Sequence, residues 1–196
     1  GDHRDLHSFP TRALPISASL YYSISLLLWQ ELGDKRNIAL GLSNMSLQSV
    51  DSAEALTLAF QSLKLAEESG DSNTIARARF SLVRYYYLRE HDLSAACEHG
   101  EYALSFMTSS EETITAMFRY NMVALLYTRQ RAYAKALNCY FKAINLASAT
   151  TDTVSIILAN KASLNANTGL VYFYLKQYAK SIEFHQRAIQ FYEVLK

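Results

Sequence analysis

The fold is decided by residues 120–143, which read YNMVALLYTRQRAYAKALNCYFKA. Apolar and small residues recur in this stretch at intervals of three and four, which places their side chains on one face of an α-helix. The recurring residues are Tyr120, Val123, Ala124 and Tyr127 on a first helix and Tyr133, Ala136, Tyr140 and Ala143 on a second. Because alanine is small, Ala124 and Ala136 allow the two helices to approach closely where they cross. The stretch therefore predicts a helix hairpin.

The same pattern returns in three other parts of the chain. In every copy, the aromatic-type position of the first helix precedes the small residue of the second helix by nine residues. These pairs are Ser46 and Ala55, Tyr87 and Ala96, Tyr127 and Ala136, and Tyr172 and Ser181. In addition, residues 31–39 return as residues 68–76, each with a Gly-Asp pair that suits the end of one helix and the start of the next. The chain is therefore predicted to consist of internal repeats.

The composition supports an all-α fold class built from antiparallel helix hairpins. The 196 residues include 6 Gly and 2 Pro, and both prolines lie before Ile16. Proline breaks helices and glycine weakens them, so their scarcity favours helices joined by short turns. The predicted helices span residues 17–32, 35–49, 52–68, 73–90, 93–108, 112–131, 133–149, 153–176 and 178–195.

This pattern resembles the tetratricopeptide repeat (TPR), a helix hairpin with aromatic and small residues at fixed positions. The clearest matches are residues 132–136, Ala-Tyr-Ala-Lys-Ala, and residues 177–181, Gln-Tyr-Ala-Lys-Ser. The resemblance covers residues 17–196 and implies a right-handed α-solenoid, with a half repeat followed by about four hairpins. The repeats are 37 to 45 residues long, whereas the usual period is about 34. They look like the lengthened repeats of bacterial signal-transduction and transcriptional regulators.

Two features depart from the TPR pattern. Arg84 aligns with the small residues Ala124 and Gly169, so the second hairpin must splay, or the guanidinium must reach the surface. The usual proline between repeats is absent from the sequence after Pro15. These departures affect the expected curvature of the solenoid and leave the hairpin architecture unchanged.

The two ends of the sequence differ from its middle. Residues 1–16 have no helical period, and residues 7–16 resemble a sequencing adaptor translated in two reading frames, so we expect residues 1–16 to be non-native. The last predicted helix carries apolar residues on more than one side: Ile182, Ile189 and Tyr192, and also Phe184, Phe191 and Leu195. Because a solenoid normally ends in polar caps, we expect residues 17–196 to be a fragment of a larger protein.

Charge and motif content argue against several functional classes. A net charge of +1 gives no basic surface for nucleic acid, and the longest apolar run is far shorter than the roughly 20 residues that cross a bilayer. Cys97 and Cys139 lack metal-ligand spacing and are expected to be buried free thiols, while His91 is expected in a solvated turn. We therefore expect a protein that is not an enzyme, with no catalytic residues, cofactor, metal, nucleic-acid partner or membrane partner.

In the TPR family, the first helix of each hairpin lines a concave groove that holds a peptide or a segment of a partner protein. The resemblance therefore implies a non-enzymatic scaffold that binds proteins or peptides, as a regulatory or sensor region of a bacterial signalling protein. Amides can bond a ligand's backbone, and arginines can pair with a carboxylate. The expected groove residues are Asn44, Gln48, Ser81, Tyr85, Arg89, Asn121, Leu125, Arg129, Leu170 and Tyr174.

Three alternatives remain open from the sequence. The first is an oligomerisation or assembly module that acts through exposed end helices. The second is an RNA-reading helical repeat, which requires a basic groove. The third concerns location: a cytoplasmic protein is expected, but a sensor domain outside the cytoplasm fits a chain whose native N-terminus is missing.

Overall fold

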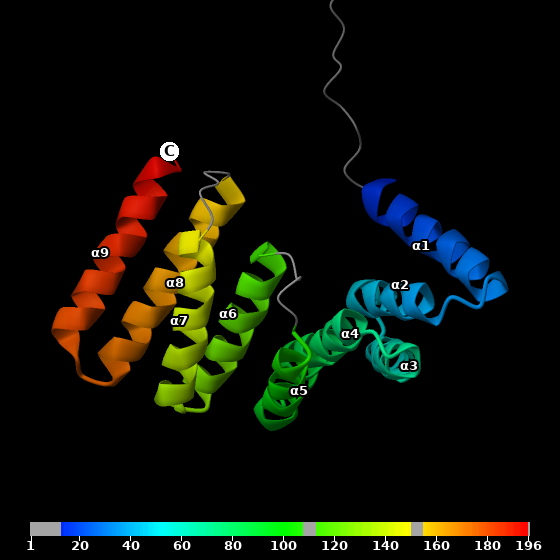
Figure 1. Ribbon diagram of the computed structural model, residues 1–196, viewed down its shortest axis with the longest axis horizontal. Coiled ribbons are helices and arrows are strands. Elements are labelled where there is room, and N and C mark those ends of the chain that lie inside the picture. The colour runs from blue at the N-terminus through cyan, green and yellow to red at the C-terminus, as the bar shows by residue number, and fades with distance from the viewer. Residues whose placement is uncertain (1–12, 108–112, 150–154, 196) are drawn as a thin grey trace, which may run out of the picture. The chain divides into compact units, whose positions relative to one another are not determined.

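The computed structural model describes residues 13–107, 113–149 and 155–195, and it describes side chains from Tyr22 onward (Figure 1). All regular structure in these residues is helical, which confirms the all-α prediction. The elements are α1 (Ala13–Glu31), α2 (Lys35–Gln48), α3 (Ser52–Ser69), α4 (Ser72–Tyr85), the π-helical segment η1 (Tyr86–Glu90), α5 (Leu93–Ser105), α6 (Thr113–Arg129), α7 (Tyr133–Ala149), α8 (Ser155–Tyr174) and α9 (Tyr178–Val194).

The chain divides into two compact units, Gly1–Ser81 and Leu82–Lys196. In the first unit, α2 packs against α3 as a hairpin, and α1 packs against α2. In the second unit, α6 pairs with α7 and α8 pairs with α9, while α7 and α8 join the two hairpins (Figure 1). The predicted pairing of neighbouring helices is therefore confirmed for these hairpins.

The predicted N-terminal boundary lies partly outside the described residues. Helix α1 begins at Ala13 and contains Pro15 in its first turn, where proline is compatible with a helix. The predicted non-native segment of residues 1–16 therefore overlaps α1 by four residues. Residues 1–12 lie outside the part of the chain that the structure describes.

Five of the helix connections that the structure describes contain a residue with left-handed backbone, in each case two positions before the next helix begins. In the first unit these residues are Gly33 (φ +66°) and Gly70 (φ +69°), which carry no Cβ and adopt this conformation readily. Asp34 and Asp71 follow them and accept hydrogen bonds from the N–H groups of Asn37 (3.1 Å) and Thr74 (2.9 Å). The Gly-Asp pairs therefore end and start helices as predicted.

In the second unit, the corresponding left-handed residues are His91 (φ 54°), Arg131 (φ 60°) and Lys176 (φ 58°). The backbone closes the same way without glycine: the Ala132 N–H bonds to the Tyr127 carbonyl, and the Gln177 N–H bonds to that of Tyr172, both at 2.9 Å. These bonds reach back five residues, as in a Schellman cap. The turns of the α6–α7 and α8–α9 hairpins thus place a residue with a side chain in the left-handed conformation, which costs conformational free energy.

The small residues lie at helix crossings, as the sequence predicts. Ala124 and Ala136 are both fully buried in the α6–α7 hairpin. In the α8–α9 hairpin, the His185 ring packs directly on Gly169, and a Cβ added to Gly169 would lie 2.5 Å from the ring atom Cε1. The Nδ1 atom of His185 donates to the carbonyl oxygen of Ser181 at 2.7 Å. Gly169 is therefore required because the His185 ring lies too close to allow a Cβ, and not because of its backbone conformation.

The π-helical segment η1 changes the helical register that the sequence alignment assumed. The Asp92 N–H bonds to the carbonyl oxygen of Tyr86, six residues back, whereas the equivalent bonds in the next two hairpins reach back five residues. One extra residue is thus accommodated in the last turn of this helix, which is the geometry of a π-bulge. Residues before η1 are shifted by one position relative to the α6 pattern.

This shift corrects the predicted position of Arg84. Val83, which is fully buried, occupies the crossing that Ala124 occupies in α6, and a Cβ added to Gly100 would lie 3.8 Å from the Cγ2 atom of Val83. Arg84 is half-buried and takes the position equivalent to Leu125. The arginine therefore does not stand at the crossing.

Candidate functional site

Four of the predicted groove residues lie together around one cavity of the second unit. Leu125 and Arg129 come from α6, and Leu170 and Tyr174 come from α8. The cavity has a volume of about 790 Å³ and is open to solvent. It is lined by Leu93, Leu125, Thr128, Arg129, Arg131, Tyr133, Leu170 and Tyr174. Residues that are about 45 positions apart in the sequence thus form one surface.

The cavity has a basic lining. Arg129 and Arg131 contribute two guanidinium groups, and none of the described lining residues is acidic. The guanidinium carbon of Arg129 lies 5.0 Å from the centre of the Tyr87 ring, in cation–π geometry. A guanidinium group presents several N–H donors in a plane, which suits a carboxylate or phosphate ligand.

One wall of the cavity is aromatic. The rings of Tyr133 and Tyr174 stack with centres 5.8 Å apart and planes inclined by 22°. Tyr133 is the first residue of α7 and Tyr174 is the last of α8, so this contact joins the two hairpins. Together with Leu125 and Leu170, these rings provide apolar surface beside the arginines. The cavity can therefore hold a ligand that combines an apolar group with a negative charge.

A polar cluster beside the cavity fixes the end of α6. Tyr127 donates its hydroxyl hydrogen to Glu101 Oε1 at 2.5 Å, and Lys135 Nζ donates to the same oxygen at 2.9 Å. These two hydrogen bonds hold the pKa of Glu101 below its usual range. Burial and the bond to Glu101 raise the pKa of Tyr127. The cluster connects α5, α6 and α7, and it orients the helix that carries Arg129.

Three other predicted residues, Asn44, Gln48 and Asn121, lie on accessible surface. In the second unit, Asn121 is half-buried, and its Oδ1 accepts a hydrogen bond from Asn167 Nδ2 at 3.2 Å. In the first unit, Asn44 is half-buried and its Oδ1 lies 3.4 Å from an Arg77 nitrogen, while Gln48 is exposed at the end of α2. The two asparagines therefore already accept hydrogen bonds from neighbouring side chains.

The remaining predicted residues are affected by the register shift at η1. Ser81 and Tyr85 are buried, at 2% and 7% exposed. The Ser81 hydroxyl donates to the Ala78 carbonyl, and the Tyr85 hydroxyl donates to Glu90, both at 2.7 Å. Arg89 follows the extra residue and is half-buried. Ser81 and Tyr85 thus act in packing, and the half-buried Arg84 takes the groove register that Tyr85 was expected to occupy.

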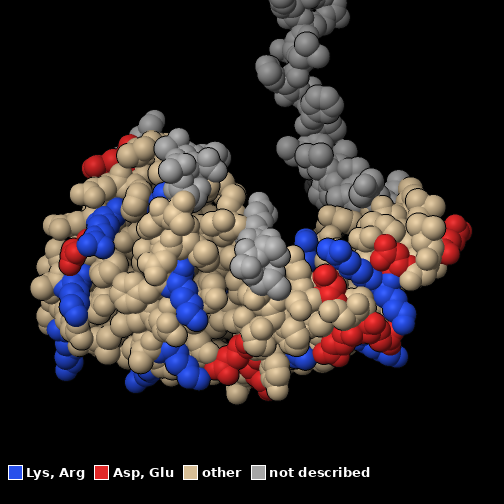
Figure 2. Space-filling view, viewed as in Figure 1, with Lys and Arg blue, Asp and Glu red and all other residues tan. Residues whose placement is uncertain are grey.

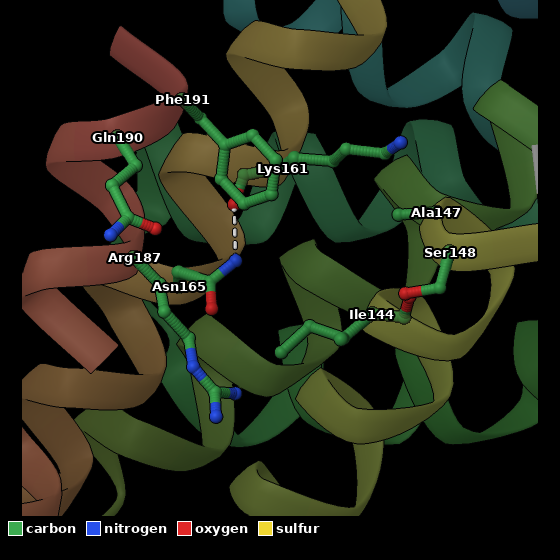
Figure 3. Close-up of a pocket in the computed structure, with 8 residues that line it drawn as sticks. All are labelled: Ile144, Ala147, Ser148, Lys161, Asn165, Arg187, Gln190 and Phe191. Carbon is green, nitrogen blue, oxygen red and sulfur yellow. Dashed lines mark hydrogen bonds between the residues drawn. The ribbon is translucent and has the colours of Figure 1, made fainter. Parts of the chain in front are cut away.

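A second, smaller cavity of about 190 Å³ lies where α7, α8 and α9 meet (Figure 3). Its Asn165 side chain donates to the Lys161 carbonyl at 2.8 Å, and the Phe191 ring covers one side of the cavity. Arg187 points toward the opposite edge and pairs with Glu183 at 2.5 Å. None of the predicted groove residues belongs to this cavity, and its arginine already has an acidic partner.

The described histidines and cysteines serve packing and turns. His99 stacks on Tyr86 with ring centres 5.4 Å apart, and His91 lies exposed in the turn before α5. Cys97 and Cys139 are buried free thiols, as predicted, and burial raises the pKa of Cys97 to about 11. Within the described residues, no group of histidine, cysteine and acidic side chains is arranged to hold a metal ion.

None of the helices that the structure describes has both the length and the apolar character needed to cross a bilayer.

Sequence reasoning missed half of the cavity lining: Leu93, Thr128, Arg131 and Tyr133. It considered the first helix of each hairpin alone, whereas Leu93, Arg131 and Tyr133 belong to turns or to the starts of second helices. One signal was present in the sequence. Arg131 and Lys176 are both basic residues two positions before a helix that begins with tyrosine, which marks these turns as a repeated surface feature.

Comparison with known proteins gave no assignment. No family model matches the sequence. No curated protein matches it significantly.

Proposed function

We propose that the chain is a non-enzymatic scaffold that binds a segment of a partner protein, and that its hairpins belong to a TPR-like right-handed α-solenoid. The observation that carries this proposal is the cavity between α6 and α8. Its lining includes Leu125, Arg129, Leu170 and Tyr174, four residues that the TPR resemblance independently assigns to a ligand groove.

The chemistry of the cavity supports a particular class of ligand. Arg129 and Arg131 favour a carboxylate, while the stacked Tyr133 and Tyr174 rings and the leucines favour an apolar or aromatic side chain beside it. The ligand we propose is therefore a peptide segment in which an acidic residue lies next to an apolar or aromatic one. The openness of the cavity to solvent suits a segment of a longer chain better than an enclosed small molecule.

We propose further that this binding serves a regulatory or sensor region of a bacterial signalling protein. This setting rests on the resemblance of the 37- to 45-residue repeats to those of such regulators.

The proposal is tested with an array of short peptides that vary independently in acidic and aromatic content. Binding of the full 196-residue chain is measured by fluorescence anisotropy. We expect acidic-aromatic peptides to bind, and Arg129→Ala or Arg131→Ala to weaken that binding by about tenfold, the loss of one charge-assisted contact. Arg187→Ala is the matched control, because Arg187 lies at the other cavity. Equal affinity in all three variants, or no preference for acidic peptides, would remove the cavity as the binding site.

A further inference from the structure

Helix α9 carries a strip of four apolar side chains that stay about half exposed beside its partner α8. They are Tyr178, Ile182, Ile189 and Tyr192, which are 55%, 58%, 54% and 48% exposed, and His185, whose ring packs on Gly169 of α8, lies between the two isoleucines. With His185 included, the intervals of four, three, four and three residues keep them on one face of a helix, because each residue advances by about 100°. Exposed apolar residues gathered on one face in this way mark an interaction surface.

The charged residues of α9 follow a different side of the helix. Lys180 lies with its Nζ 5.2 Å from the centre of the Tyr172 ring, and Arg187 lies 5.1 Å from the Phe184 ring while pairing with Glu183. In Figure 2, positive and negative side chains alternate along α9 on the face toward the viewer. The strip itself contains no lysine, arginine or acidic residue.

In the preceding hairpin, the face of α7 that corresponds to the α9 strip packs against another helix. On α7, the residues Tyr133, Leu137 and Ile144 stand 45 positions before Tyr178, Ile182 and Ile189. All three α7 residues are half-buried, because helix α8 packs on this hairpin and places Tyr174 on Tyr133. The α7 face thus receives another helix, and the equivalent α9 face has the residue types to do the same.

The order of side chains along the strip identifies the helix that fits it. With His185 included, the strip reads Tyr-Ile-His-Ile-Tyr in both directions, so two antiparallel α9 helices related by a two-fold axis near His185 present matching surfaces. Ile182 of one copy then lies near Ile189 of the other, and the tyrosines meet at the two ends. A two-fold interface of this kind uses the same patch on both chains.

Charge at the ends of α9 favours the same arrangement. Lys176 precedes the N-terminus of α9, and Glu193 lies in its last turn; both are exposed. Antiparallel pairing brings Lys176 of one copy near Glu193 of the other, whereas parallel pairing would place like charges together. Antiparallel helix dipoles also attract. We propose that the chain forms a homodimer through an antiparallel contact between the α9 strips of two copies.

The mass of the full chain in solution tests the dimer. Sedimentation equilibrium should give twice 22.2 kDa at micromolar to millimolar concentration. Ile182→Glu or Ile189→Glu should raise the dimer Kd by about 100-fold or more. In a two-fold interface each chain contributes one copy of the substitution, so dimer formation buries two carboxylates. Ile156→Glu is the matched control, since Ile156 is 52% exposed on α8 and lies outside the strip. Circular dichroism confirms that each variant folds.

Cysteine cross-linking tests the orientation. Oxidation of a mixture of Tyr178→Cys chains and Tyr192→Cys chains should join the two kinds of chain, while each variant alone should remain largely uncross-linked. The native cysteines are buried and should not interfere. A monomer at every concentration, or a dimer that persists in Ile182→Glu and Ile189→Glu, would overturn the proposal. Efficient self-cross-linking of Tyr178→Cys would overturn the antiparallel arrangement.

Discussion

Replacing Gly169 with alanine should destabilise the α8–α9 hairpin, although alanine is the better helix former. The added methyl group would lie 2.5 Å from His185 Cε1 and 3.1 Å from the carbonyl oxygen of Ser181. The ring must therefore move, and it then loses the hydrogen bond that Nδ1 makes to Ser181 at 2.7 Å. Backbone crowding at the Ser181 oxygen limits how far the helices can adapt.

Three contributions determine the size of the effect. Helix propensity favours alanine over glycine by about 1 kcal/mol. The lost hydrogen bond costs about 1 kcal/mol, and overpacking at a helix crossing costs about 1–3 kcal/mol. The first two contributions cancel, so Gly169→Ala should lower the free energy of unfolding by about 1–3 kcal/mol.

A double-mutant cycle with His185→Ala separates the clash from other causes. Without the imidazole ring, Gly169→Ala should gain up to about 1 kcal/mol from helix propensity. The coupling between the two sites should therefore reach about 2 kcal/mol or more. Urea unfolding followed by circular dichroism measures all four proteins. A stabilising Gly169→Ala in the presence of His185, or a coupling near zero, would refute the packing of this ring on Gly169.

Other parts of the chain give further predictions. Ala136→Leu should destabilise the α6–α7 hairpin by about 1–3 kcal/mol in urea, because Ala136 is fully buried at the crossing; unchanged stability would place the crossing elsewhere. The pKa of Glu101 is lowered in the folded state, so the ionised carboxylate stabilises the fold. This stabilisation is present above the pKa of Glu101 in the unfolded chain, and it is lost as the pH falls through the pKa of Glu101 in the folded chain. Glu101→Gln should therefore flatten the acid side of the stability–pH curve, and an unchanged curve would contradict the cluster. Cys97 and Cys139 should react with a thiol reagent only after urea unfolds the chain, because both are buried and the Cys97 pKa is about 11; rapid native labelling would count against that burial. His91→Gly should stabilise the fold by about 0.5–1 kcal/mol, since relief of left-handed strain exceeds the added entropy of glycine, and a lower melting temperature would argue against the φ of 54°.

The helices and their pairing were predictable because apolar spacing and small crossing residues act locally. Ala124, Ala136 and Gly169 each combine small size with a fixed distance from an aromatic residue, and all three lie buried at helix crossings. The Gly-Asp turns at Gly33 and Gly70 were equally predictable from the sequence, because glycine and aspartate have specific roles at helix ends.

The π-helical segment was not predictable from spacing alone. The nine-residue interval between Tyr87 and Ala96 matches that between Tyr127 and Ala136, although the carbonyl that takes the place of the Tyr127 carbonyl in the turn belongs to Tyr86. The interval therefore gave no sign of the shift, and Ser81 and Tyr85 were assigned one position away from their true register. The contribution of Arg131 and Tyr133 to the cavity was missed for a different reason, since it depends on how α7 and α8 pack together.

The left-handed position in the hairpin turns has a consequence for how such sequences diverge. The backbone is left-handed at this position whether it holds histidine, arginine or lysine, so the identity of the side chain does not determine the left-handed conformation. Substitutions there can change the charge at the ends of the hairpins while every helix stays in place. Variation at residues 91, 131 and 176 would then record changes of binding partner, whereas variation at residues 124, 136 and 169 would record changes in helix packing.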